Sequence, residues 1–188
     1  MDKKDIRCFV AVDLPSAMRD QIAAMQNEID VPGVKLVKPD LIHLTLKFLG
    51  DVAPRKVDQV TEALRKIEFP AFDAKVSGVG TFPGKTIRVV WIGAQGNFPE
   101  LHRHVDDALA PLGFEREMRE FSAHATIARV RRPNPEMNQL LASRLTPFKK
   151  VELGEFQVDR FLLKQSTLTP GGPIYDDLAH FVLVAHKV

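Results

Sequence analysis

The sequence repeats one strand pattern, and this repeat restricts the possible folds more than any other feature. The pattern is His-x-Thr followed by an apolar residue. It opens "HLTLKFLG" at residue 43 and "HATIARV" at residue 124. Side chains alternate between the two faces of a strand, so each segment presents an imidazole and a hydroxyl on one face and apolar groups on the other. The sequence therefore predicts two strands that each bury one face and expose a polar one.

The alternation assigns the residues of the first motif strand to its two faces. His43, Thr45 and Lys47 are predicted to face water or a cleft. The opposite face is wholly apolar and is predicted to lie in the core; it carries Ile42, Leu44, Leu46 and Phe48.

The second motif strand follows the same rule. His124 and Thr126 share one face, and Ala125 lies on the other. Arg129 falls on the face opposite His124, so it reaches a cleft only where the strand twists or ends. If the two motif strands face each other, two imidazoles and two hydroxyls gather in one place.

The remaining segments predict an α+β fold. Strands are expected over 6–14, 41–49, 72–82, 86–94, 121–130, 150–166 and 180–188, and the turn-rich "TLTPGGPIYDD" is expected to be a loop. Helices are expected over 16–30, after Pro54, over 98–112 and over 136–145. Several strands follow one another directly, which favours antiparallel sheets over a doubly wound parallel sheet. Each motif strand precedes a helix that starts near a proline, so we expect two similar lobes within a single domain, residues 1–188.

Composition excludes several classes of protein. The chain has 188 residues, a net charge of +2 and a pI of about 8.7, which argues against a protein that coats long nucleic acids. Cys8 is the only cysteine, so we expect no intrachain disulfide and a reducing compartment. No run of about 18 apolar residues indicates a membrane span, and the N-terminal segment does not read as a signal peptide. A cytoplasmic location is expected.

Two imidazoles beside two hydroxyls suit phosphoester chemistry without a metal or another cofactor. Histidine titrates near neutral pH, so one ring can accept a proton while the other donates one. Threonine hydroxyls can donate hydrogen bonds to the non-bridging oxygens of a phosphate. No nucleophilic side chain is needed if water or a ribose hydroxyl attacks the phosphorus.

Other candidate sites in the sequence are weaker. "GTFPGKT" lacks the first glycine of a phosphate-binding P-loop and precedes a predicted strand instead of a helix, so a hairpin turn is expected there. His102 and His104 lie two apart on a predicted helix and cannot share one metal ion; both are expected on the surface. A metal-dependent phosphoesterase would need further ligands beside His43 and His124, and the sequence shows no such cluster.

The chain resembles the RNA 2',3'-cyclic phosphodiesterases of the 2H phosphoesterase superfamily, once named 2'-5' RNA ligases. The resemblance is carried by the two motif blocks, "KPDLIHLTLKFLG" and "FSAHATIARV". It extends to "IRCFVAVDLP", "GVGTFPGKTIRVVWIG" and "GPIYDDL", and so covers essentially the whole chain. Leu36 stands where many relatives have tryptophan, and Ala123 where proline usually precedes the second histidine; neither change removes a reactive group.

The resemblance implies a bilobal fold with two antiparallel sheets, flanking helices and pseudo-twofold symmetry around a central cleft. It also implies hydrolysis of a ribose 2',3'-cyclic phosphate to a 2'-phosphate. By family analogy, His124 takes the proton from water and His43 protonates the leaving 3' oxygen, although the sequence does not separate the two roles. Thr45 and Thr126 would bind the phosphate.

Two residues outside the motifs are candidates for contact with RNA. Arg129 would bind RNA phosphates, and the alternative is a solvated basic rim. Tyr175 would stack on a base, as would Phe48, Phe82 or Phe121, and packing in the core is the alternative for each.

The sequence leaves substrate and assembly open. Candidate substrates are RNA ends such as tRNA fragments, or small cyclic nucleotides, and a monomer is expected. The competing hypothesis is a non-catalytic protein that binds RNA ends or nucleotides on the same fold. Attack by an RNA 5'-hydroxyl in place of water would make a 2'-5' linkage with the same histidine pair.

Overall fold

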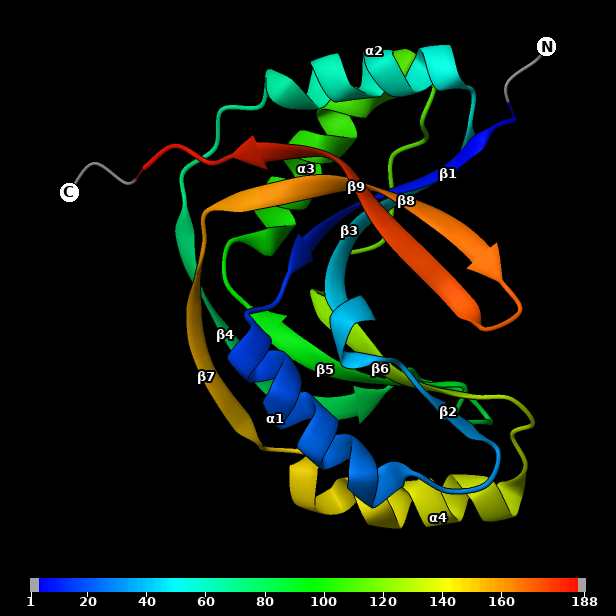
Figure 1. The fold of residues 1–188 in the computed structure, drawn as a ribbon. Coiled ribbons are helices and arrows are strands. Elements are labelled where there is room, and N and C mark those ends of the chain that lie inside the picture. Colours follow the sequence, from blue (N-terminus) through cyan, green and yellow to red (C-terminus); the bar gives the residue numbers. More distant parts are fainter. Residues whose placement is uncertain (1–3, 186–188) are drawn as a thin grey trace.

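The computed structural model, which describes residues 4–185, contains α-helices and antiparallel strands (Figure 1). The α-helices are α1 (Ser16–Gln26), α2 (Pro54–Arg65), α3 (Phe98–Leu109) and α4 (Pro135–Leu145). The strands are β1 (Ile6–Asp13), β2 (Val34–Leu36), β3 (His43–Val52), β4 (Phe72–Thr81), β5 (Val89–Gln95), β6 (His124–Val130), β7 (Glu152–Val158), β8 (Arg160–Thr169) and β9 (Gly172–Val182). The predicted α+β class is confirmed.

The sheet consists of two antiparallel halves. The strand order is β7-β4-β5-β6-β3-β1-β8-β9, with β2 added to β6. The two motif strands, β3 and β6, lie at the centre, and each is followed outward by three more strands. This arrangement gives the expected pseudo-twofold relation: β3-β1-β8-β9 forms the upper half in Figure 1, and β6-β5-β4-β7 the lower half.

The two halves meet where the motif strands pair. Leu44 pairs with Ala125, and this is the only pair between β3 and β6 in the described part of the chain. Both side chains are buried in the hydrophobic core. Helices α2 and α3 cover the upper half, and α1 and α4 the lower half (Figure 1).

Helix starts follow local sequence signals. Pro54 and Pro135 occupy the first positions of α2 and α4, where a missing backbone N–H costs nothing. The side chain of Asn134 caps α4 by accepting a hydrogen bond of 2.7 Å from the N–H of Met137. The prolines at both helix starts, and the Asn134 cap of α4, explain why the two predicted helices begin where they do.

A β-bulge interrupts both motif strands at the same offset from the histidine. In β3, Leu46 has no partner, because Val10 of β1 pairs with Lys47 and the next residue, Ala11, pairs with Thr45. In β6, the unpaired residue is Ile127. A bulge adds one residue to one strand and so reverses the alternation of faces beyond it.

The bulge overturns part of the face assignment in β3. Lys47 was predicted to face water or a cleft; it is among the residues that line the cleft, but it is only 5% exposed. Phe48 was predicted to lie in the core and is 70% exposed. Simple alternation fails here because the period of two applies only to a strand without an inserted residue.

Two further expectations need correction. The predicted strand 150–166 is two strands, β7 and β8, which join at Asp159. The predicted loop "TLTPGGPIYDD" is a tight hairpin between β8 and β9, so Tyr175 lies in a strand. The turn uses Gly172 at a φ of 122°, a conformation that favours glycine, and closes with a hydrogen bond from Thr169 Oγ1 to the Gly172 carbonyl.

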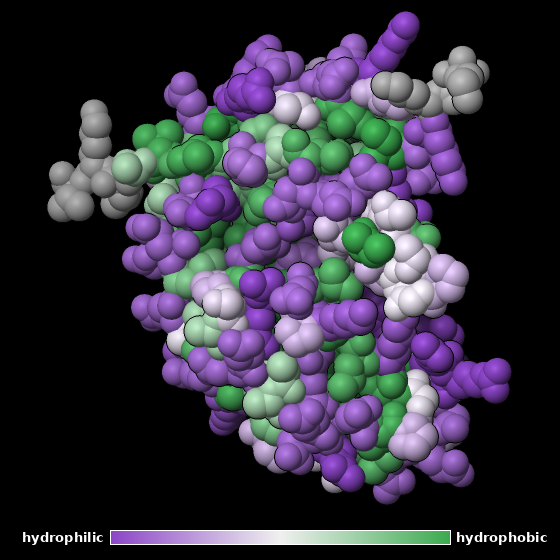
Figure 2. All heavy atoms as spheres, viewed as in Figure 1, coloured by the Kyte–Doolittle hydropathy of each residue, from purple (hydrophilic) through white to green (hydrophobic). Residues whose placement is uncertain are grey.

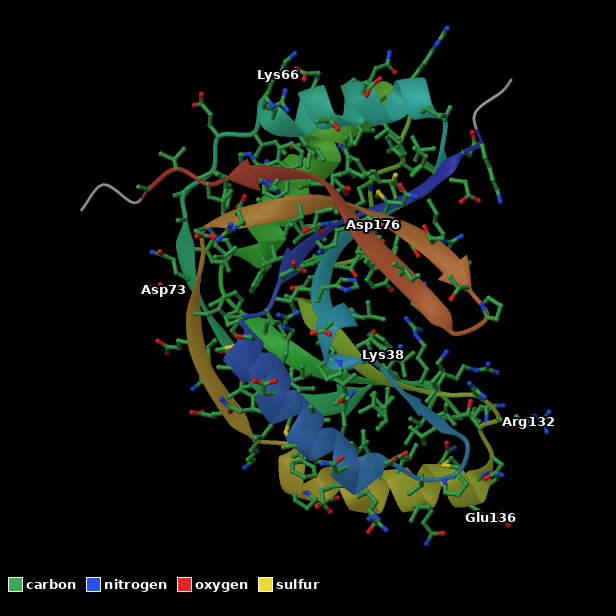
Figure 3. All side chains as sticks on the ribbon, in the orientation of Figure 1. Lys38, Lys66, Asp73, Arg132, Glu136 and Asp176 are labelled. Atoms are coloured by element: carbon green, nitrogen blue, oxygen red, sulfur yellow. The ribbon has the colours of Figure 1, made fainter. Side chains whose placement is uncertain are left out.

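The surface is mostly hydrophilic in the view of Figure 2. A patch of neutral and hydrophobic colour lies over the tip of the β8–β9 hairpin, where Leu168 and Ile174 are exposed (Figure 2). Figure 3 shows side chains filling the space between the two halves, with Lys38 in the segment between β2 and β3. Within residues 4–185, no helix meets the length and apolarity required to cross a membrane.

Candidate active site

A cleft of about 620 Å³ lies between the two halves of the sheet. The four motif side chains predicted to do chemistry all line it: His43, Thr45, His124 and Thr126. Its walls come from both halves, since β2, the β8–β9 hairpin and the segment before β6 also contribute. The fold therefore brings together residues that lie far apart in the sequence.

The pairing of the two motif strands sets the arrangement of these side chains. With Leu44 opposite Ala125, an antiparallel register places His43 across from Thr126 and Thr45 across from His124. Each imidazole thus faces the hydroxyl of the other half. Because Leu44 and Ala125 point into the core, their four neighbours point to the cleft.

Both histidines are held by the same type of hydrogen bond. Nδ1 of His43 lies 2.8 Å from the carbonyl oxygen of Leu41, and Nδ1 of His124 lies 2.7 Å from that of Ser122. A carbonyl oxygen only accepts hydrogen bonds, so Nδ1 carries the proton in both rings. This bond selects the tautomer whose Nε2 has a free lone pair, and Nε2 is the nitrogen available to a substrate.

The surroundings of His43 favour its uncharged form. Its ring centroid lies 4.8 Å from that of Phe9 and 5.3 Å from that of Tyr175. The pKa of His43 is lowered, mainly because burial disfavours the imidazolium, while the bond to Leu41 and the charge of Asp13 act in the opposite direction. His43 is therefore uncharged near neutral pH in the free protein.

Charged groups behind His43 form an ion triad. The buried Lys164 amino group lies 3.0 Å from Asp13 Oδ2 and 2.6 Å from Asp177 Oδ1. Asp13 pairs with His43 across β1 and β3, which explains its effect on the ring. Sequence reasoning missed this triad, because its three residues come from three strands whose register the sequence does not reveal.

His124 has aromatic neighbours of its own. The ring of Phe82 lies 5.0 Å away in an edge-to-face arrangement, and that of Trp91 lies 6.2 Å away. Phe82 lines the cleft and corresponds in this respect to Tyr175 beside His43. Both rings were candidates for base stacking, and both lie at the cleft.

The bulges bring one further residue of each motif strand to the cleft. Arg129 was predicted to lie on the far face of its strand, but it is exposed and lines the cleft, because the bulge at Ile127 reverses the alternation. Phe48 occupies the corresponding position in the first motif strand. Since β3 and β6 run in opposite directions, these two side chains lie toward opposite ends of the cleft.

Two groups of residues that line the cleft were not predicted from the sequence. Phe121 is the one member of these groups that was a candidate. Lys35 of β2 pairs with Arg129 and adds a second cation at that end. At the other end, residues 115–122, which we call the wall segment, contribute Glu117, Arg119, Glu120, Phe121 and Ser122 to the lining. Neither group belongs to the His-x-Thr repeat, so its place in the cleft is apparent only in the folded structure.

Of the two predicted surface histidines, neither is exposed. His102 is 5% exposed and stacks on Phe121 with ring centroids 4.4 Å apart. His104 is half-buried and packs edge-to-face against Phe69. The two do point in different directions, as helix geometry requires. Within residues 4–185, no three His, Cys, Asp or Glu side chains are grouped to hold a metal ion.

Comparison with known families gives one matching family model. Residues 12–91 and 93–175 match the model described as "LigT like Phosphoesterase". The first matched stretch contains His43, and the second contains His124.

Relatives match along nearly the whole chain. A protein of Archaeoglobus fulgidus, named RNA 2',3'-cyclic phosphodiesterase, is 41% identical over 94% of this chain and 99% of its own length. A protein of the same name from Methanocaldococcus jannaschii is 38% identical over 91% of this chain and 97% of its own.

Solved structures share the fold. A protein of Thermus thermophilus superposes with a TM-score of 0.81 at 28% identity, covering 96% of this chain and 100% of that one. The structure of E. coli LigT complexed with 3'-AMP superposes with a TM-score of 0.77 at 25% identity, covering 96% and 99%.

Proposed function

Because the chain belongs to the LigT-like phosphoesterase family and is a phosphoesterase, we propose that it hydrolyses the 2',3'-cyclic phosphate at the end of an RNA to a 2'-phosphate. The relatives named RNA 2',3'-cyclic phosphodiesterase support this substrate. The observation that carries the proposal is the paired arrangement of His43, Thr45, His124 and Thr126 around the Leu44–Ala125 pair. Each half supplies one histidine and one threonine, so we treat residues 1–188 as a single domain.

The reaction needs a proton acceptor and a proton donor on opposite sides of the phosphorus. Water attacks in line with the 3' oxygen, and the bare Nε2 of one ring accepts a proton from the water. The other ring enters the reaction as an imidazolium, protonated on both nitrogens, and donates its Nε2 proton to the departing oxygen. The P–O3' bond breaks as the new P–O bond forms, and the ribose keeps a 2'-phosphate. Thr45 and Thr126 donate hydrogen bonds to the non-bridging oxygens, where charge grows in the transition state.

Two arguments bear on which ring takes which role, and they point in opposite directions. Family analogy makes His124 the base. The lowered pKa of His43 makes that ring the uncharged one in the free protein, which suits the base. We therefore propose the roles of base and acid for the two rings jointly. A substrate whose leaving group needs no proton distinguishes which ring is the acid.

The two ends of the cleft suit different parts of an RNA end. We propose that Arg129, with Lys35 beside it, contacts phosphates of the chain, because guanidinium and ammonium groups bind phosphate oxygens. Phe48 at the opposite end offers a ring for stacking on a base. Tyr175, which lies beside His43 and within reach of the charge of Arg129, offers a second. The pKa of Tyr175 is raised, mainly by burial, so its phenol keeps its proton.

The same pair of histidines would also catalyse attack on the phosphorus by a group other than water. An RNA 5'-hydroxyl that replaces water loses its proton to the base, displaces the 3' oxygen and forms a 2'-5' phosphodiester. No additional residue and no cofactor enters either reaction as proposed.

The test is to incubate the protein with an oligonucleotide that ends in a 2',3'-cyclic phosphate, without ATP and with a metal chelator. We expect an oligonucleotide with a 2'-phosphate. A 3'-phosphate product, or activity that disappears with the chelator and returns with added metal, would contradict the mechanism. Binding without turnover would favour the non-catalytic hypothesis instead.

A further inference from the structure

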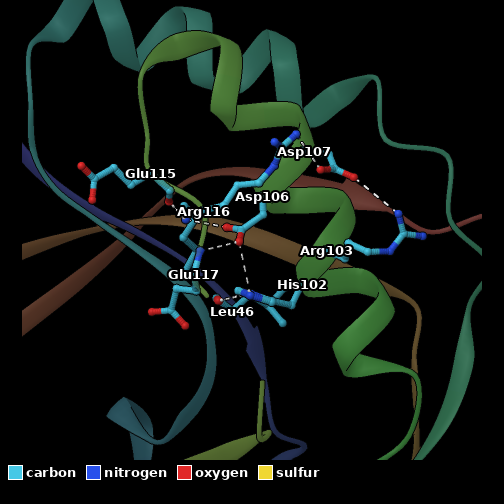
Figure 4. A network of polar contacts seen from close by, with 9 residues as sticks. Leu46, His102, Arg103, Asp106, Asp107, Glu115, Arg116 and Glu117 are labelled. Atoms are coloured by element: carbon cyan, nitrogen blue, oxygen red, sulfur yellow. Dashed lines mark hydrogen bonds and ion pairs between the residues drawn. The ribbon is translucent and has the colours of Figure 1, made fainter. Parts of the chain in front are cut away.

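Three buried polar residues, one of which lines the cleft, take no part in the proposed chemistry. Lys47 of β3 is 5% exposed, and His102 and Asp106 of α3 are 5% and 4% exposed. Figure 4 shows His102 and Asp106 side by side on α3. We call them the buried network. Burying charged groups is costly unless each is paired and hydrogen-bonded, so a network of this kind calls for an explanation.

The Lys47–Asp106 ion pair reaches the main chain of the wall segment at two points. The Lys47 amino group donates to Asp106 Oδ1 and, over 2.7 Å, to the carbonyl oxygen of Glu115. The other carboxylate oxygen, Asp106 Oδ2, accepts a hydrogen bond of 2.9 Å from the N–H of Glu117 (Figure 4). The ion pair thus holds both ends of a short stretch of backbone.

The wall segment has few other attachments. It contains no helix or strand, and within residues 4–185 no backbone–backbone hydrogen bond joins residues 115–122 to the rest of the chain. The side chain of Arg116 makes an ion pair of 2.9 Å with Asp107, but both groups are exposed, and exposed pairs contribute little. The buried network is therefore the main restraint on this stretch of backbone.

The wall segment leads directly to the second catalytic histidine. Phe121 stacks on His102, and the carbonyl oxygen of Ser122 accepts the hydrogen bond from Nδ1 of His124. The network also touches the first motif strand, because Nδ1 of His102 donates over 2.9 Å to the carbonyl of Leu46. The two motifs are thus braced against each other through α3.

The other half shows that the strand itself does not require this network. Ala128 is the residue of β6 that corresponds to Lys47, since each follows the bulged residue of its strand. Ala128 is fully buried and carries no charge. A bulged motif strand therefore folds with a small apolar residue here, and the charge at Lys47 serves something outside the strand.

We propose that Lys47, Asp106 and His102 are positioning residues for His124: they fix the wall segment, and the wall segment fixes the Ser122 carbonyl that orients the ring. The effect on ring orientation is expected at His124 and not at His43, because the carbonyl that holds the His43 ring belongs to Leu41, which lies before β3 and outside the wall segment. Loss of the network allows the His124 ring to turn, and displacement of a catalytic group by about 1 Å can cost about 100-fold in rate.

The test replaces the ion pair with apolar residues in the double variant Lys47→Met/Asp106→Leu. Such replacements are often neutral for stability, so the fold is expected to survive. We expect kcat to fall by about 10- to 100-fold with little change in KM. In nitrogen NMR spectra of the imidazoles, His124 is expected to become a mixture of tautomers, whereas His43 keeps its proton on Nδ1 and serves as an internal control.

Two further variants make the result decisive. Asp106→Asn keeps the shape but gives up one carboxylate oxygen, so it releases the Glu117 N–H while disturbing the core least; it is expected to show the same His124 change. Arg116→Ala removes the exposed ion pair of the same segment and is expected to change kcat by less than about twofold. If the folded variants at Lys47 and Asp106 keep wild-type kcat and a single His124 tautomer, the proposal is overturned.

The kinetic readout rests on the proposed function, and the tautomer readout does not. A wild-type protein that fails to hydrolyse a cyclic phosphate would refute the proposed function alone. The NMR comparison of His124 with His43 needs no substrate and would still decide whether the network positions the ring.

Discussion

The two motif strands have the same backbone features but carry different side chains beyond their bulges. Both begin with His-x-Thr, both hold Nδ1 of the histidine with a carbonyl two residues earlier, and both bulge three residues after the histidine. Beyond the bulge they diverge, with Lys47 and Phe48 in β3 and Ala128 and Arg129 in β6. The symmetric part carries the proposed chemistry, and the asymmetric part carries the two kinds of contact proposed for an RNA end.

This comparison separates what the repeat must keep from what it can change. Protons must be accepted on one side of a phosphorus and donated on the other, so a nearly symmetric pair is suited to the chemistry. A base and a phosphate chain require an aromatic ring at one end of a cleft and a cation at the other. The predictions below test the shared centre first and the divergent surroundings afterwards.

The largest effects are expected from the histidines. His43→Ala and His124→Ala should each lower kcat by about 10²- to 10⁴-fold, because each removes one proton-transfer group. The double variant should be little slower than the worse single variant, since the two act as a unit. Calorimetric binding of a 2'-nucleotide should persist in both.

His180 provides the control for these variants. It is an exposed histidine of β9 outside the cleft, and His180→Ala should leave kcat unchanged. A variant of His43 or His124 that keeps more than about a tenth of wild-type kcat would contradict the proposal that both histidines transfer protons.

The threonines should come next. Thr45→Val and Thr126→Val each remove a donor to the phosphate and should lower kcat by about 10²-fold, and Thr→Ser should restore most of the rate in each case. Steady-state kinetics with a cyclic nucleotide measure this. A loss at one threonine and none at the other would show that the phosphate is held by one half only.

A change of leaving group assigns the roles of the histidines. A nucleoside 2'-phosphate esterified with p-nitrophenol loses its phenolate without needing a proton, so the variant that lacks the acid should recover to within about tenfold of wild type. Recovery of His43→Ala assigns the acid to His43, as family analogy implies. Recovery of His124→Ala assigns it to His124, as the lowered pKa of His43 favours. Equal behaviour of the two variants would contradict any division of roles.

Arg129 and Phe48 test the divergent ends. Arg129→Ala should raise KM for an oligonucleotide by about tenfold and reduce the slope of log KM against log salt by about one, because one phosphate contact is lost. Phe48→Ala should raise KM by an amount that depends on the base and leave the salt slope unchanged, because stacking is uncharged. Matching salt slopes in the two variants would mean that the ends do not differ as proposed.

The smallest expected effect is on stability. His43 has a lowered pKa in the folded protein and about 6.5 when unfolded, so the unfolded chain binds the proton more readily as pH falls. The free energy of unfolding should therefore decrease below about pH 6.5, and each 1 kcal/mol should lower Tm by about 2–4 °C. His43→Gln should flatten this part of the Tm–pH curve, and an unchanged curve would refute the lowered pKa.

The repeat allowed the fold class and the four central side chains to be predicted from the sequence. The alternation in "HLTL" and "HATI" assigned His43, Thr45, His124 and Thr126 to one face, and the structure places all four in one cleft. The prediction failed beyond the bulges, because no local signal marks the unpaired Leu46 or Ile127. Arg129 and Phe48 were therefore assigned to the wrong faces, and the burial of Lys47 was not predicted.

Contacts between segments that lie far apart in the chain could not be predicted from the sequence either. His102 was expected on the surface, but in the interior its Nδ1 donates to the Leu46 carbonyl, and its Nε2 lies 3.5 Å from Asp106 Oδ2. The Lys164 triad depends on the register of β1, β8 and β9. A histidine or a lysine is stable in such places only when specific partners are brought to it, and partners of this kind are set by tertiary structure.

The most direct test of the central claim is a structure of the protein with a nucleoside 2',3'-cyclic vanadate, whose geometry resembles five-coordinate phosphorus. The account predicts that Nε2 of His43 and Nε2 of His124 each lie within about 3 Å of a different apical oxygen, with Thr45 and Thr126 at the equatorial oxygens. A vanadate held by only one motif, or by both histidines on the same oxygen, would contradict it.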